Sequence, residues 1–288
     1  MDRAGLAAGG VALIGAPGRI GRDGLLRLCF EQRGASTVVA SSRSTLPLQV
    51  LAPVVLDDPA AVVSILNPTG GLVGGDRLTI DVVACAGSHA CLTTPSATKV
   101  YRTDAEPAVH DVTLRLAADA TVEWVPDHTI PFAGSALRQR IDVSMAAGAQ
   151  LILVDAFAAG RVARGEAWSF RLLESTLDIR DERGRRLHDR FVLEGNAMWS
   201  RLGFAEGASY FATVVALGDG ARDPGPAMKA ALSDAAGVRH AMARLGDGGA
   251  MVRCLAPTAP ALLDALGALW SAARGTLLGL PALALRKP

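Results

Sequence analysis

Short runs of alternating apolar and polar residues recur along this chain from Gly24 onward, and glycine, proline or aspartate closes each run. A period of two residues is typical of a β-strand that buries one face. No helical segment of about 10 to 15 residues alternates with these runs, which disfavours a doubly wound parallel sheet. The sequence therefore predicts a mostly β fold of many short strands. The predicted strands are residues 25–30, 78–83, 112–116, 149–154, 168–172 and 210–217.

Helical spacing appears only near the end of the chain. Apolar residues recur every three or four positions from Met228 to Leu245, which predicts one amphipathic helix. A second apolar stripe opens near Pro260 and predicts a helix that ends at Gly275. Residues 250–255 alternate and predict a strand between the two helices. Such stripes are usually core faces, and a partner-binding surface is the alternative interpretation.

The composition argues against several classes of protein. The 29 Lys and Arg residues nearly balance the 28 Asp and Glu residues, so no general positive field attracts nucleic acid or anionic lipid. Four cysteines without a C-x-x-C pair suit a reducing cytoplasm better than a disulfide scaffold. Residues 254–273 form a long apolar span, but two prolines and an aspartate interrupt it. We therefore expect a cytoplasmic protein that binds neither nucleic acid nor a membrane.

The first 20 residues differ from the rest of the chain. Residues 4–16 are apolar, yet Asp2 cancels the charge of Arg3 and glycines are frequent. This favours a flexible extension over 1–20 rather than a secretion signal. No linker, low-complexity tract or internal repeat is evident later, so residues 21–288 are predicted to form a single β-rich domain.

Two glycine-rich segments, residues 15–21 and 70–76, invite comparison with phosphate-binding loops. Neither continues into Gly-Lys-Ser/Thr, and the second precedes a predicted strand, whereas a phosphate loop opens a helix. Tight turns that need positive φ explain the second segment better. Ser96 and Lys99 match the S-x-x-K pattern of acyl-enzymes, but their flanks are β-prone and no S-D-N or K-T-G element is present. No catalytic residue is predicted.

Three potential metal ligands, Cys85, His89 and Cys91, flank an Ala-Gly-Ser turn. A hairpin there could bring together two thiolates and an imidazole, which nickel or zinc accepts. No fourth ligand follows nearby, and small buried cysteines on strands are common, so structural cysteines are the alternative.

Asp155 is a carboxylate placed directly after the apolar run 151–154. A buried aspartate is costly unless it is paired or hydrogen-bonded. Its structural interpretation is a bond to a backbone turn or an ion pair with Arg161 or Arg164. Its functional interpretation is a transient contact for a passing cation.

Four segments resemble the signatures of the urease accessory protein UreD family, also called UreH. They are residues 67–76 (NPTGGLVGGD), 93–102 (TTPSATKVYR), 123–132 (EWVPDHTIPF), and Asp155 leading into 160–166 (GRVARGE). Their order and spacing agree over residues 24–280, which makes chance agreement negligible. The motif residues are Gly70, Gly71, Gly74, Gly75, Thr94, Pro95, Lys99, Tyr101, Arg102, Gly160, Arg161, Gly165 and Glu166.

The resemblance implies a β-helix-like stack of strands with two C-terminal helices. It also implies a non-catalytic scaffold that binds UreF, recruits the GTPase UreG through it and docks on apo-urease for nickel insertion. The family's proposed nickel tunnel implies acidic and hydroxyl contacts at Asp76, Thr98, Asp155 and Asp189. No permanently bound cofactor is expected, only transient Ni²⁺, and isolated carboxylates suit transit better than a thiolate cage. A structural adaptor without metal transit and a metal-dependent hydrolase are the alternatives.

Overall fold

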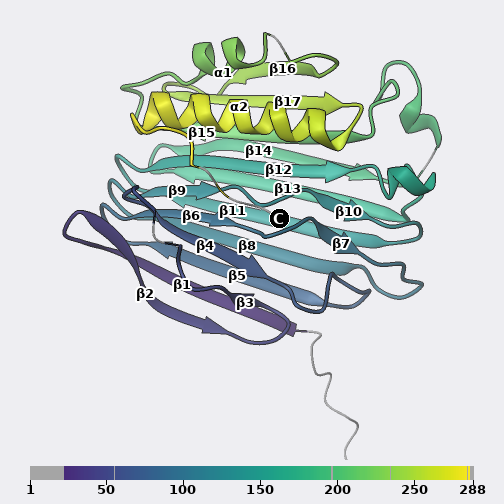
Figure 1. Cartoon of the computed structure of the whole chain (residues 1–288), viewed down its shortest axis with the longest axis horizontal. Coiled ribbons are helices and arrows are strands. Elements are labelled where there is room, and N and C mark those ends of the chain that lie inside the picture. Colours follow the sequence, from purple (N-terminus) through teal and green to yellow (C-terminus); the bar gives the residue numbers. More distant parts are fainter. Residues whose placement is uncertain (1–22, 55, 196, 234, 284, 286–288) are drawn as a thin grey trace, which may run out of the picture.

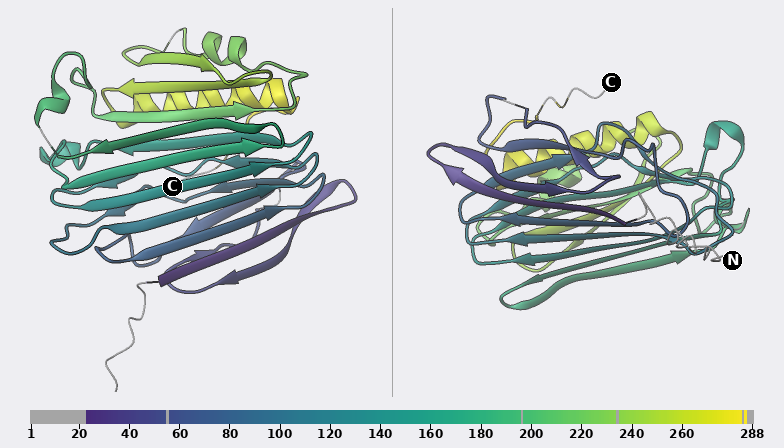
Figure 2. Two further views of the ribbon diagram at one scale, coloured as in Figure 1. Left: turned by 180° about the vertical axis from the view of Figure 1, so that it is seen from behind. Right: turned by 90° about the horizontal axis from the view of Figure 1, so that it is seen from below.

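The computed structural model describes residues 23–54, 56–195, 197–233, 235–283 and 285, so the extension predicted over 1–20 lies outside the described residues. Its strands form two facing sheets (Figure 1). The first sheet has seven strands, in the order β14 (Gly184–Leu193), β13 (Leu172–Asp181), β11 (Ala136–Met145), β8 (Ala108–Leu116), β5 (Arg77–Ala84), β1 (Asp23–Arg33) and β2 (Ser36–Ser44). Figure 2 shows this sheet from behind, on the side away from the long helix.

The second sheet has ten strands, and the long helix covers it (Figure 1). Its main path is β16 (Arg239–Arg244), β17 (Gly249–Ala256), β15 (Tyr210–Leu217), β12 (Gln150–Ala158), β9 (Thr121–Trp124), β6 (His89–Thr93), β4 (Ala61–Leu66) and β3 (Gln49–Val50). Two short strands lie off this path: β10 (Thr129–Pro131) pairs with β12 and with β7 (Thr98–Val100).

The chain coils between the two sheets. Strands β5, β8, β11 and β13 are parallel neighbours in one sheet, and β4, β6, β9 and β12 are parallel neighbours in the other. The result is a β-solenoid of about four turns, followed by antiparallel strands and two helices. The predicted mostly β stack with two late helices is thereby confirmed. Parallel pairing needs no helical crossover here, because the opposite sheet supplies the return path.

Stacked four-residue turns connect the two sheets at one end of the solenoid. The turns are residues 85–88, 117–120 and 146–149. In each turn the backbone N–H of the fourth residue donates to the carbonyl oxygen of the first residue, at 3.0 to 3.2 Å. The third residue of each has positive φ: Gly87 at 70°, Asp119 at 56° and Gly148 at 72°. Gly87 N–H also donates to the next turn, at Ala118 O, at 3.0 Å. The structure thus contains a repeat that the sequence did not reveal. What recurs is the turn geometry and the alternation of inward apolar side chains, and the residue types themselves do not repeat.

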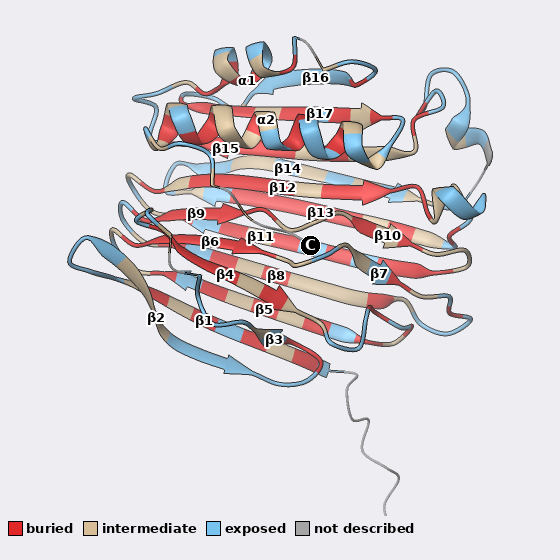
Figure 3. Cartoon of the chain, in the orientation of Figure 1, coloured by how far each residue is buried: buried red, intermediate tan, exposed pale blue. Residues whose placement is uncertain are grey.

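Two apolar layers hold the fold together (Figure 3). Inward side chains of both sheets fill the solenoid, with Phe30, Leu114 and Leu151 among the fully buried ones. The opposite face of the ten-stranded sheet packs against the helices through residues such as Ile152 and Val214. Strands of this sheet that lie under helix α2 (Ala259–Leu277) are therefore apolar on both faces, as in β12.

A buried ionic network fastens α2 to the ten-stranded sheet. The Arg274 guanidinium is 0% exposed and lies 3.1 Å from a Glu123 oxygen and 2.8 Å from Asp58 Oδ2. Glu123 also lies 2.6 Å from His89 Nε2 and accepts from Trp270 Nε1 at 2.5 Å. An arginine removed from water in this way is tolerated because both carboxylates face it directly.

Most predicted strands are confirmed, and residues 210–217 coincide with β15. The predicted strand at 168–172 is wrong, since regular pairing starts only at Leu172. Trp168 has φ of 60°, in the left-handed region, and its ring stacks on Phe211 with centroids 6.0 Å apart. The alternating aromatic residues at 168–172 therefore serve loop packing rather than one face of a strand.

The late helices are confirmed, but their extents are not. Helix α1 covers only Gly225–Ala231, and Met242 lies on edge strand β16. Gly237, at φ of 74°, turns the chain between them. Helix α2 passes through Gly275 and ends at Leu277, and Gly279 takes the left-handed conformation instead. In the part of the chain that the structure describes, no helix combines the length and apolarity needed to cross a membrane. Two 3-10 helices, η1 (Val162–Arg164) and η2 (Ala197–Ser200), complete the described elements.

Candidate functional site

Polar side chains interrupt the apolar interior of the solenoid at matching positions of both sheets. On each strand they occupy the inward phase of the alternation, as Gln139 does between Leu137 and Ile141. His110, Gln139 and Ser175 are register partners on β8, β11 and β13 of the seven-stranded sheet. Asp155, Thr213 and Arg253 are register partners on β12, β15 and β17 of the other sheet. We call these six residues the interior polar row, of which Arg253 is the most exposed, with 57% of its side chain accessible.

Hydrogen bonds join the two halves of this row at Asp155. Gln139 Nε2 donates to Asp155 Oδ1 at 2.8 Å, and Ser175 Oγ donates to Asp155 Oδ2 at 3.0 Å. On the far side of Gln139, its Oε1 lies 3.3 Å from His110 Nδ1. Asp155 is therefore held by neutral donors from the opposite sheet. The alternative of an ion pair with Arg161 is wrong, because Arg161 Nε donates to Glu166 at 2.7 Å instead. Among the described residues, Asp155 forms no ion pair with Arg164 either.

The interior raises the free energy of charged groups. Burial raises the pKa of Asp155 from 3.8 to about 6; the hydrogen bonds from Gln139 and Ser175 oppose this rise, and the charge of Asp189 adds to it. Burial lowers the pKa of His110, against the effect of its bond to Gln139. A carboxylate and a neutral imidazole thus share a region where an added cation would find negative charge without a fixed counter-ion.

Asp155 borders the smaller of two large cavities. This Thr98 cavity has a volume of about 280 Å³ and is also lined by His110, Gln139 and Thr98. Two of the sequence motifs meet at its wall, which includes Gly70, Gly71, Thr94, Pro95 and Lys99. The structure therefore brings two of the four tunnel candidates, Thr98 and Asp155, to the wall of one cavity.

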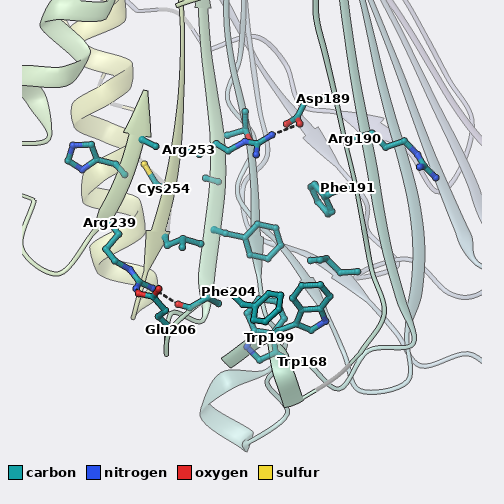
Figure 4. A pocket seen from close by; sticks show the side chains of 18 residues that line it. Trp168, Asp189, Arg190, Phe191, Trp199, Phe204, Glu206, Arg239, Arg253 and Cys254 are labelled. Atoms are coloured by element: carbon teal, nitrogen blue, oxygen red, sulfur yellow. Dashed lines mark hydrogen bonds and ion pairs between the residues drawn. The ribbon is translucent and has the colours of Figure 1, made fainter. Parts of the chain in front are cut away.

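Asp189 borders a second cavity, the aromatic cavity, of about 550 Å³ (Figure 4). It forms an ion pair with Arg253 of β17, which joins the two sheets. Further along the cavity, Trp168, Trp199 and Phe204 gather below this pair (Figure 4). Thr213 also lines the aromatic cavity and is the register partner of Asp155. Since adjacent strands lie about 4.8 Å apart, the two cavities approach each other to within one strand spacing at this pair.

Asp76 does not line either of these two cavities. Its Oδ2 accepts from Val73 N–H at 2.8 Å, within the glycine-rich turn. Gly70 and Gly75 have φ of 85° and 79°, as the turn interpretation requires. A Cβ at Gly71 would overlap the Lys99 carbonyl oxygen, which is bonded to Leu72 N–H at 2.8 Å. The segment therefore needs its glycines for backbone geometry and close approach.

The other motif residues hold loops. Tyr101 Oη donates to Gly70 O at 3.2 Å, and Thr94 Oγ1 accepts from Asp127 N–H at 2.9 Å. Gly74 lies against Thr103, where a Cβ would overlap the threonine side chain. Arg102 is exposed and lies 3.6 Å from Asp104.

The segment 160–166 forms a compact turn. The Arg161 guanidinium pairs with Glu166 and lies 4.2 Å over the Phe132 ring. Gly165 ends the short helix with φ of 73°, and Gly160 has φ of 144° beside the Glu166 carbonyl. These contacts stabilise the loop. Asp155 is bonded within the interior polar row instead of to this segment.

Cys85, His89 and Cys91 do not come together as metal ligands among the described residues. His89 faces Glu123 in the ionic network, and Cys91 is buried in the layer beneath the helices. Cys85 instead lies with its Sγ 3.6 Å from Cys29 Sγ. Strand alternation explains the separation, because β6 sends His89 and Cys91 toward α2 while Cys85 precedes the turn.

Sequence reasoning missed Gln139, Ser175, His110 and Arg253. Each one occupies an inward position of a strand whose flanking inward positions are apolar. The sequence signal that could have identified them is a polar residue at a strand position whose neighbours two residues away on either side are apolar. The pairing of those positions across the solenoid could not be seen without the coil register.

Comparison with known proteins places this chain in a family. The family model described as UreD urease accessory protein matches residues 22–288. A urease accessory protein UreD of Alkalilimnicola ehrlichii is 33% identical over 92% of this chain and 91% of its own length. UreD 2 of Streptomyces griseus is 34% identical over 95% and 96%, and UreD of Deinococcus radiodurans is 32% identical over 95% and 99%. With the solenoid and its motif-lined cavity, these matches show that the chain belongs to the UreD family of urease accessory proteins.

Proposed function

We propose that this chain acts in urease maturation as a non-catalytic scaffold through whose interior Ni²⁺ passes toward apo-urease. The observation that carries the proposal is the interior polar row between the Thr98 cavity and the aromatic cavity. Elsewhere the solenoid interior is filled by apolar side chains. Polar side chains bordering two cavities are what a hydrated cation needs to move through a protein.

The row suits transit better than storage. Asp155 offers one carboxylate held by two neutral donors, and Asp189 is already paired with Arg253. Divalent nickel held by a single carboxylate and hydroxyl groups dissociates readily, whereas thiolate or multi-histidine sites retain it. Because burial disfavours the charge of Asp155, an arriving cation gains from neutralising it. Asp155 therefore attracts the ion without enclosing it.

The partners in this proposal are UreF, UreG and apo-urease. They are supported by family membership, since the matched relatives are named urease accessory proteins. Phe204 lines the aromatic cavity and is 47% exposed, and Leu202, two residues earlier in the chain, is 87% exposed. These exposed apolar side chains are compatible with a partner surface at one end of the proposed route.

The test replaces Asp155→Asn, which removes the charge and keeps the shape and one acceptor. Asp142→Asn is the matched control, because Asp142 lies on β11 with an exposed ion pair to Arg140 on the outer face. Each variant is co-expressed with urease, UreF and UreG, and the nickel content of purified urease is measured together with pull-down of UreF. We expect loss of nickel loading with Asp155→Asn and a normal UreF complex with both variants.

A second variant tests the wider set of carboxylates. The double change Asp76→Ala and Asp155→Ala removes two of the three predicted acidic contacts. Normal nickel loading by this double variant would refute the passage and leave the adaptor function. Loss of UreF binding by Asp155→Asn would also refute it, since the site would then serve assembly instead.

A further inference from the structure

Three side chains with metal-ligating atoms gather on the outer face of the seven-stranded sheet. Cys29 and Glu31 lie on β1, and Cys85 follows the last residue of β5. The two Sγ atoms are 3.6 Å apart, and a carboxylate oxygen of Glu31 lies within 4.8 Å of both. All three side chains are partly accessible, so an ion can reach them from solvent.

The strands fix this arrangement. Leu28 and Phe30 face the interior, so Cys29 and Glu31 point outward from the same strand. Cys85 N–H donates to Phe30 O at 2.9 Å, which extends the β1–β5 pairing by one residue. The third group is thereby held beside the other two by a backbone hydrogen bond to β1, at the point where the turn 85–88 begins.

The sulfur separation matches that of a metal-bound thiolate pair. With metal–sulfur bonds of about 2.3 Å, as for zinc, a separation of 3.6 Å corresponds to an S–metal–S angle of about 103°, near the tetrahedral value. A disulfide would require the sulfur atoms to approach to about 2.0 Å. An ion between the thiolates therefore fits with less movement than a covalent bond between them.

The donors select the class of ion. Two thiolates and a carboxylate favour a borderline or soft divalent ion, and they disfavour calcium and magnesium, which take oxygen ligands. The nearest competing contact is the exposed Arg33–Glu31 pair at 3.5 Å, which is weak enough to be displaced. Three ligands leave a fourth position for water or for a donor from another molecule.

We propose that Cys29, Glu31 and Cys85 form a binding site for one Zn²⁺ or Ni²⁺ ion on the outer face of the solenoid. This site is separate from the interior passage, because its three side chains lie on the outer face of the sheet and none of them lines the Thr98 cavity or the aromatic cavity. It also replaces the Cys85, His89 and Cys91 grouping that the sequence suggested.

The test titrates the reduced full-length chain with Co²⁺ as a spectroscopic probe, and then with Zn²⁺ or Ni²⁺ as competitor. We expect one ion per chain and a near-ultraviolet thiolate-to-cobalt charge-transfer band that the competitor abolishes. Cys29→Ser and Cys85→Ser should each weaken binding at least about 100-fold, since even the loss of a group that only hydrogen-bonds to a metal ligand lowers metal affinity 10- to 100-fold. Glu31→Gln should weaken binding at least about tenfold and keep the band.

Two controls separate this site from the others. Cys91→Ala removes a buried cysteine beneath the helices and should leave the band and the affinity unchanged. Asp155→Asn should do the same even if it abolishes nickel loading of urease. A wild-type chain without the band would overturn the proposal, as would a band that Cys91→Ala removes and Cys29→Ser leaves intact.

Discussion

Replacing Asp155 with Asn should stabilise this protein while impairing its function. Burial raises the pKa of Asp155 from 3.8 to about 6, so the folded chain carries an ionised group that its interior disfavours. One pKa unit is equivalent to about 1.36 kcal/mol, so the rise corresponds to at most about 3 kcal/mol at neutral pH. The figure is an upper bound, because the side chain is only partly buried and borders the Thr98 cavity.

The sign of the pH dependence follows from proton binding. Between pH 3.8 and about 6 the folded state keeps the Asp155 proton and the unfolded state releases it. The free energy of unfolding therefore falls as the pH rises through this range, and the loss persists above it. In the Asn variant this contribution is absent, so its advantage over wild type should be small near pH 4 and largest above pH 6. Groups that do not interact with Asp155 cancel in the comparison.

Urea denaturation of both chains from pH 4 to pH 8 measures this difference. We expect equal m-values and a variant midpoint that exceeds the wild-type midpoint increasingly up to about pH 7. A variant that is less stable than wild type at pH 7.5, or a difference independent of pH, would refute the assignment of a strained buried carboxylate. A stabilising change that abolishes nickel loading would identify a residue retained for function.

Three further predictions concern the scaffold. Arg274→Met should lower the free energy of unfolding by about 3 to 5 kcal/mol, because Glu123 and Asp58 would lose the buried guanidinium that faces them. A loss below about 1 kcal/mol in urea denaturation would contradict the network. Gly71→Ala should lower the free energy of unfolding by at least about 2 kcal/mol, because the added Cβ would overlap the backbone. Gly267→Ala, in open space on α2, should raise it by about 0.5 to 1 kcal/mol. Equal melting temperatures of the two variants would refute the packing argument. Hydrogen bonding from an arginine lowers the pKa of Asp178 to about 2. The stabilising contribution of this carboxylate should therefore disappear as the pH falls from about 4 to 2. In Asp178→Asn, the free energy of unfolding should depend less on pH in that range, as measured by acid unfolding.

Several parts of the fold could be read from the sequence because they depend on local pattern. Strand β15 and the strand between the helices followed from alternation. The helix expected from Met228 to Leu245 failed, since apolar residues at steps of three and four also suit a short helix followed by a strand. Pairing of β16 with β17 decided the matter, and this is a tertiary contact.

The candidate site divides in the same way. Asp155 stood out as a carboxylate in an apolar strand, and Thr98 stood out through its motif. Asp76, by contrast, accepts a bond within its own turn, so motif membership did not place it at a cavity. Cys29 was unremarkable in sequence because its partner Cys85 lies 56 positions away and reaches it only through β1–β5 pairing.

The sequence by itself determined the β-rich class, the two late helices and membership of the UreD family, because alternation, helical periodicity and motifs are local properties of the chain. Tertiary structure alone decided which polar residues face one another. The coil register sets His110, Gln139 and Ser175 side by side and opposes them to Asp155. A shift of one residue would turn each of these side chains to the other face, so the site exists only as a consequence of strand register.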